Sequence, residues 1–147
     1  MSLPIDVRFA AEPEPLRAVR QRARDALTEA LASRNDVENA LLVFDELASN
    51  AIEHGTGYRR GGEPLRVAFA LEGRDLVLQF EDHDMPSADV KALRAVFAAG
   101  VPELPDFEDE RGRGLFLIVT TLESIQVHAI AEVGMRLVGR VPGVAAQ

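Results

Sequence analysis

The sequence contains no cysteine and no apolar run long enough to cross a bilayer. The first absence excludes disulfides, thiolate metal sites and a catalytic thiol, and it fits a reducing compartment. The N-terminus also lacks the basic and apolar pattern of a secretory signal. We therefore expect a cytoplasmic protein with no membrane-spanning segment.

Positive charge is also scarce, because 16 Lys and Arg residues stand against 24 Asp and Glu residues. The resulting net charge of -8 argues against direct nucleic-acid binding, which requires a positive face. It permits a protein partner that carries basic patches.

What the sequence does contain is typical of one soluble domain. Its 147 residues predict a single domain over 1–147, large enough to bury a hydrophobic core. Apolar residues make up 47% of the chain and charged residues 27%, which are ordinary globular values.

Apolar periodicity and turn-forming residues predict the order of the elements. Asn35 or Asp36 is the expected N-cap of the second helix, and 100–111 is expected to be a surface loop that acts as a lid. The expected elements are a strand at 5–9, helices at 16–32 and 37–52, strands at 65–71 and 76–81, helices at 90–99 and 115–122, and strands at 125–130 and 135–141. Strands grouped in hairpins predict an α+β fold, a two-layer sandwich whose mixed, mostly antiparallel sheet carries helices on one face.

The end of the second helix carries the first candidate site. Glu46 and Asn50 are four residues apart and therefore share one helix face. A carboxylate beside a carboxamide indicates either a polar site lined by this helix or a solvated face.

Two further groups of residues, which we call polar stations together with Glu46 and Asn50, lie where a ligand could reach them. Asp82 stands at the end of a predicted central strand, and Gly112, Arg113 and Gly114 precede the apolar helix at 115–122. Paired glycines allow a phosphate to approach the backbone, and the free amides of a helix N-terminus favour an anion. Taken alone, such a glycine pair is more often a simple turn than a phosphate site.

Together these stations resemble the N box and the two glycine boxes of the ATPase superfamily that includes gyrase and histidine kinases. The matching residues are Glu46, Asn50 and His54 in one helix, Asp82 after a hairpin strand, and the run 111–118. The short chain and the run Arg-Gly-Leu-Phe-Leu-Ile are most similar to the anti-sigma factor serine/threonine kinases. These are small bacterial regulators that bind a sigma factor and phosphorylate a STAS-domain anti-anti-sigma protein. The resemblance covers nearly the whole chain and implies the Bergerat ATP-binding fold; its relatives are often homodimers.

The resemblance also implies roles for individual residues, with ATP and Mg²⁺ as cofactors. Asn50 would ligate the Mg²⁺ ion, and Glu46 would act as general base or orient the nucleophile. Asp82 would accept a hydrogen bond from the adenine amino group. Gly112 and Gly114 would line the path of the phosphates, and Arg113 would offset their charge.

Two departures from the family pattern keep other interpretations open. Asp84 stands where the family usually has glycine, and Met135 stands where it often has threonine. Both positions lie on the base and sugar side of the expected nucleotide, so nucleotide binding is either weakened or lost in an intact fold. One alternative is thus a non-catalytic regulator that sequesters its partner, with a degenerate pocket. A detached histidine-kinase catalytic domain is another, which the short lid and the missing phosphoacceptor helices disfavour.

Overall fold

The structure is a computed structural model that describes residues 3–59, 62–99 and 110–146. Its elements, in chain order, are β1 (Ile5–Phe9), α1 (Pro13–Ala30), α2 (Arg34–His54), β2 (Leu65–Glu72), β3 (Asp75–Pro86), α3 (Ser87–Ala99), α4 (Glu110–Thr121), β4 (Ser124–Ala129) and β5 (Val133–Val141). None of the described helices is long and apolar enough to span a membrane. The expected lid at 100–111 falls almost wholly outside the described residues.

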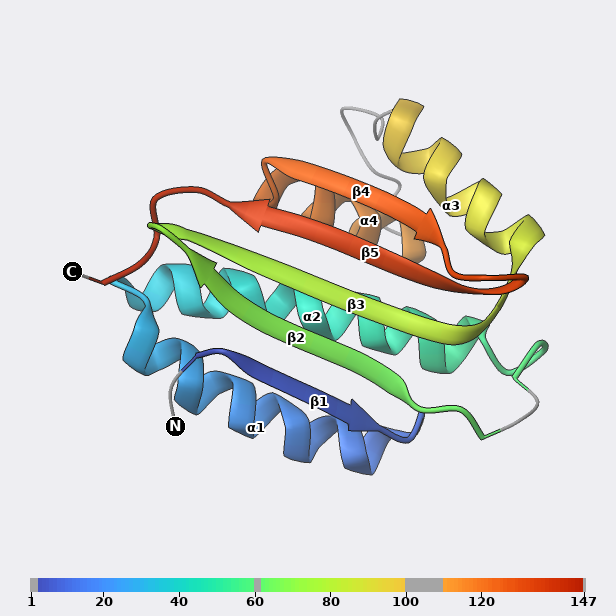
Figure 1. The fold of residues 1–147 in the computed structure, drawn as a ribbon, viewed down its shortest axis with the longest axis horizontal. Helices are drawn as coiled ribbons and strands as arrows, with labels where there is room; N and C mark the ends of the chain where they lie inside the picture. Colours follow the sequence, from blue (N-terminus) through green and yellow to red (C-terminus); the bar gives the residue numbers. More distant parts are fainter. Residues whose placement is uncertain (1–2, 60–61, 100–109, 147) are drawn as a thin grey trace.

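The strands form one sheet in the order β1-β2-β3-β5-β4, and each described pair is antiparallel. Helices α1, α2 and α4 lie behind this sheet in the view of Figure 1, and α3 lies beside the end of β4 and β5. The predicted α+β sandwich with helices on one face is therefore confirmed. The described sheet is antiparallel throughout, without the parallel pairs that a mixed sheet would contain.

Helix α2 crosses the middle of the sheet and forms the centre of the core. Its Phe44 is fully buried and packs edge-to-face between Phe9 of β1 and Phe69 of β2, with ring centroids 6.0 Å and 6.3 Å away. Alternate residues of β2 point toward the helices, since side chains alternate along a strand. This packing anchors α2 against β1 and β2.

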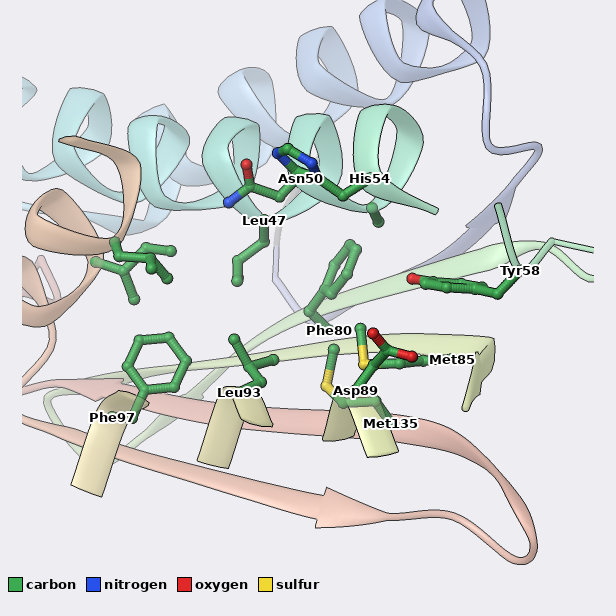
Figure 2. Close-up of a pocket in the computed structure, with 13 residues that line it drawn as sticks. Leu47, Asn50, His54, Tyr58, Phe80, Met85, Asp89, Leu93, Phe97 and Met135 are labelled. Carbon is green, nitrogen blue, oxygen red and sulfur yellow. The ribbon is translucent and has the colours of Figure 1, made fainter. Parts of the chain in front are cut away.

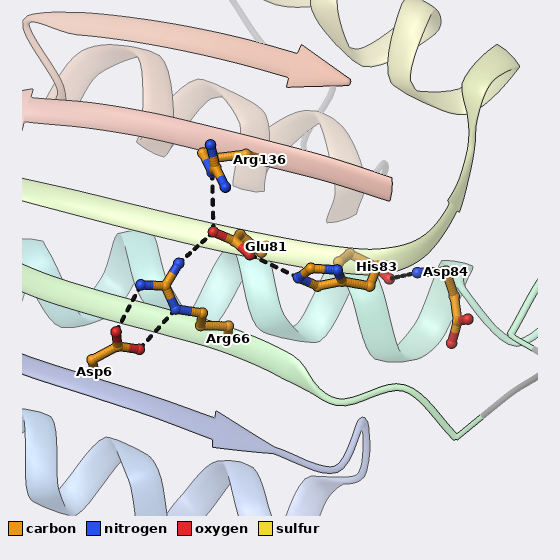
Figure 3. A network of polar contacts seen from close by, with 7 residues as sticks. Asp6, Arg66, Glu81, His83, Asp84 and Arg136 are labelled. Carbon is orange, nitrogen blue, oxygen red and sulfur yellow. Dashed lines mark hydrogen bonds and ion pairs between the residues drawn. The ribbon is translucent and has the colours of Figure 1, made fainter. Parts of the chain in front are cut away.

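The opposite face of the sheet carries a polar network around the buried Glu81 of β3 (Figure 3). Its carboxylate accepts hydrogen bonds from Arg66 of β2 and, at 3.0 Å, from Arg136 of β5. The His83 ring lies 2.7 Å from its other oxygen, and Arg66 also binds Asp6 of β1. The network therefore links four neighbouring strands in one register.

Several element boundaries differ from those predicted. Ser33 is the N-cap of α2, because its side chain accepts from the amide of Asp36 at 3.1 Å; the prediction of Asn35 or Asp36 was wrong. Strand β3 continues past Asp82 to Pro86, since Pro86 still pairs with Val133 beyond an irregularity in the ladder. The sequence did not predict this extension, because the polar residues at 81–84 interrupt the alternation of apolar and polar side chains.

Candidate functional site

A cavity of about 270 Å³ lies between the helices and the sheet, at the end where α2 finishes. Figure 2 shows Asn50 and His54 projecting from α2 on one side, and Asp89, Leu93 and Phe97 from α3 on the other. Its lining residues are Leu47, Asn50, Ala51, His54, Tyr58, Phe80, Met85, Asp89, Leu93, Phe97, Leu115, Ile118 and Met135. An apolar cavity with a few polar groups is typical of a small-molecule site.

Asn50 lies on the cavity wall because it shares a face of α2 with Leu47 and His54. Leu47 and Ala51 are buried, whereas Asn50 is half-buried and His54 exposed. The structure therefore places the predicted metal ligand at the cavity and brings His54 beside it. The preceding Asp45 points away and binds Arg20 of α1 at 2.6 Å, which ties the two helices together.

Glu46 packs against α4 and is absent from the cavity lining. A Cβ atom built on Gly114 would lie 2.2 Å from Oε2 of Glu46, so a side chain at position 114 would displace this carboxylate. Glycine is required at position 114 because α2 and α4 pack closely there. Glu46 and Asn50 remain one turn apart on α2.

The expectation that the glycine pair precedes a helix was wrong. Helix α4 begins at Glu110, so Gly112 and Gly114 lie inside it. The amides of the cap and of the first three helical residues lack intrahelical partners, which places the free amides of α4 at 110–112, before Gly114. The side-chain placement of Arg113 lies outside the described part of the structure. A phosphate path along Gly112, Arg113 and Gly114 stays a prediction.

Asp82 lies on the helix-facing side of β3 and is fully buried. Its Oδ2 accepts from the Tyr58 hydroxyl at 2.7 Å and from Arg59 Nη2 at 3.0 Å. Its Oδ1 accepts from Arg59 Nη1 and from the amide of Asp84, each at 3.1 Å. The carboxylate expected to bind adenine is thus bound by side chains of this chain.

Sequence reasoning missed Tyr58 and Arg59, which no motif marks. Both follow the end of α2, and the guanidinium of Arg59 lies 5.4 Å from the centre of the Tyr58 ring. Burial and the hydrogen bond to Asp82 raise the pKa of Tyr58, so its hydroxyl remains a donor at neutral pH.

The two departures from the family pattern occupy distinct places. The carboxylate of Asp84 lies 3.4 Å from Arg59 Nη1, so its charge is paired with that arginine. Met135 pairs with Asp82 across β3 and β5 and is 2% exposed in the cavity wall. Asp84 thus supports Arg59, and Met135 adds an apolar surface to the cavity.

The residues fit the cofactors expected from the sequence in part. Asn50 offers an amide oxygen, which suits Mg²⁺. This cation usually takes one or two ligands from the protein and the rest from phosphates and water. No group of three or more His, Asp or Glu side chains within 3–59, 62–99 and 110–146 forms a separate metal site. Asp82 does not fit its expected role, because its acceptor positions are filled.

Comparisons with known proteins give one family and two similar structures. The family described as the histidine kinase-like ATPase domain matches residues 9–138. A chain of the SiaB-SiaC complex from Pseudomonas aeruginosa is similar with a TM-score of 0.75 and 14% identity over 93% of this chain and 88% of that one.

The RsbU and RsbW domains of Rv1364c from Mycobacterium tuberculosis give a TM-score of 0.65 at 18% identity, covering 99% of this chain and 33% of that chain. This protein thus spans about a third of the length of that chain. A search of curated proteins returned no match. At these identities the two structures support the fold.

Proposed function

Because the chain belongs to the histidine kinase-like ATPase domain family, we propose that it is a regulatory serine/threonine kinase of the anti-sigma type. It would bind ATP with Mg²⁺ and phosphorylate a STAS-domain partner. The family itself is an ATPase domain family, which implies a nucleotide site. The observation that carries the proposal is Asn50 on the cavity wall, with Glu46 one turn away and fitted against Gly114.

The proposed chemistry divides between these two residues of α2. Asn50 would hold Mg²⁺, which offsets the charge of the phosphates. Glu46 would accept the proton of a serine or threonine hydroxyl while the hydroxyl oxygen forms its bond to the γ-phosphorus and the bond to the ADP oxygen breaks. The apolar wall around Phe80 and Met135 would exclude water from the purine ring of the nucleotide.

The named structural neighbours support a role with a protein partner. One is a SiaB-SiaC complex, and the other joins an RsbU domain to an RsbW domain. A net charge of -8 also favours partners with basic surfaces, and we assign a sigma factor and a STAS-domain protein to this role.

A second candidate function is a regulator that sequesters its partner without phosphorylating it. The observation that favours it is the filled carboxylate of Asp82, which removes the expected contact to adenine. The two candidates differ in whether phosphoryl transfer occurs.

Transfer from radiolabelled ATP to candidate STAS domains separates them. We expect Asn50→Ala to abolish metal-dependent transfer, and Glu46→Ala to lower the transfer rate about 10²- to 10⁴-fold with little change in nucleotide affinity. Glu53→Ala is the matched control, since Glu53 is exposed on the same helix. Transfer that survives both substitutions contradicts the assigned roles, and nucleotide binding without transfer supports the sequestering regulator.

A further inference from the structure

Arg59 occupies a closely fitted position beside the cavity. Besides its bonds to Asp82, its Nη2 donates to the carbonyl of Ala51 at 2.8 Å, and its side chain is 16% exposed. A Cβ atom at Gly55 would lie 2.4 Å from Nη2 and 2.1 Å from the same carbonyl oxygen. Glycine at position 55 therefore leaves the room that the guanidinium fills.

The carboxylate of Asp82 has no acceptor position left for a ligand. An ionised carboxylate offers about four lone-pair positions. Two donors from Arg59, the hydroxyl of Tyr58 and the amide of Asp84 occupy them. A ligand amino group could reach Asp82 after one of these donors had left.

Such an exchange is unfavourable on electrostatic grounds. The bonds from Arg59 join two charged groups, and these are about twice as strong as hydrogen bonds between neutral groups. Asp82 is 0% exposed, so losing Arg59 would leave a buried carboxylate without its counter-charge. Asp84 also accepts from the same guanidinium, with its Oδ2 3.4 Å from Nη1.

We propose that Arg59 determines base specificity in this pocket: by saturating Asp82, it prevents recognition of the exocyclic amino group of a purine. The inference rests on the proposed nucleotide site. Phe80, Met85 and Met135 of the remaining wall are apolar and contact a ring without distinguishing its substituents. Asp89 also lines the cavity, but it is exposed to solvent, so its carboxylate contributes little to the discrimination between ligands. The pocket therefore accepts 6-amino and 6-oxo purine nucleotides alike.

Calorimetric titration with ATP and with ITP, each with Mg²⁺, tests this inference, because the two nucleotides differ in the amino or oxo group at position 6. We expect the wild-type protein to bind both equally, and Arg59→Ala to prefer ATP by about tenfold or more once Asp82 can accept from the amino group. Arg22→Ala is the matched control, since Arg22 is exposed on α1 and its loss removes the same charge.

Tyr58→Phe provides a second, milder variant in case Arg59→Ala does not fold. It frees one position on Oδ2 and keeps the ion pair, so we expect a smaller preference for ATP. A wild-type preference for ATP, or a folded Arg59→Ala protein without one, overturns the inference and leaves the proposed function standing. If no variant binds either nucleotide, the proposed function fails together with the inference.

Discussion

Glu81 and Asp82 are adjacent buried carboxylates of β3, and because side chains alternate along a strand they point to opposite faces of the sheet. Each is neutralised by arginine, Glu81 by Arg66 and Arg136 and Asp82 by Arg59. Burial acts to raise the pKa of Glu81, but hydrogen bonds from Arg136 and His83 and the charge of Arg66 lower it below its ordinary value. Glu81 therefore stabilises the sheet, while Asp82 lies on the face that carries the helices and the cavity.

The lowered pKa of Glu81 predicts how stability changes with pH. Because the folded pKa lies below the unfolded value of about 4.5, the carboxylate stabilises the fold above that pH and loses this effect as pH falls through the folded pKa. We expect Glu81→Gln to lower the free energy of unfolding at pH 7 by about 1–3 kcal/mol, with a smaller difference from wild type in acid. Urea unfolding at a series of pH values measures this, with the exposed Glu132→Gln as control. Parallel pH curves for wild type and Glu81→Gln contradict it.

At the scale of single residues, sequence reasoning located Asn50 at the cavity but not the partners of Asp82. Asn50 follows from its helical spacing to Glu46, which is local information. Tyr58 and Arg59 are separated from Asp82 by 24 and 23 residues, and they follow a helix end without periodicity. The contact depends on how the turn after α2 folds back, which no local pattern specifies.

At the scale of elements, the contact of α2 with α4 depends on Gly114. We expect Gly114→Ala to lower the free energy of unfolding by about 1–3 kcal/mol and to slow phosphoryl transfer, because its Cβ atom must displace the carboxylate of Glu46. Chemical unfolding and a transfer assay measure the two effects.

Gly57→Ala is the control for this substitution, since a Cβ atom there meets nothing within 4 Å. Equal stability and equal transfer rates for the two alanine variants would show that a Cβ atom at position 114 does not displace the carboxylate of Glu46.

The helices and strands were mostly predictable from the sequence, whereas their ends were not. Glycine costs about 1 kcal/mol in a helix interior relative to alanine, so a glycine pair in a sequence indicates a turn before a helix. Helix α4 nevertheless includes both Gly112 and Gly114, and at Gly114 the close approach of Glu46 accounts for the glycine. At Ser33, a cap was predicted two or three residues too late, because several capping residues stand in a row.

At the scale of the molecule, the layered arrangement follows from hairpins and amphipathic helices, but the cavity does not. The cavity forms because α3 lies opposite α2 at one end of the sheet, with β5 placed between β3 and β4. This order joins Met135 to Asp82 across two strands that are far apart in the sequence. Long-range pairing of this kind has no local signal in one sequence.

The thermal stability of the whole protein in the presence of ATP and Mg²⁺ tests the central claim most directly. A ligand that binds the native state alone stabilises it, by about 2.7 kcal/mol at a hundredfold excess over Kd. We expect ATP with Mg²⁺ to raise the melting temperature of the wild-type protein, and the magnesium-dependent part of that rise to vanish in Asn50→Ala. An unchanged melting temperature at millimolar ATP and Mg²⁺ would contradict the proposed kinase and leave a partner-sequestering regulator.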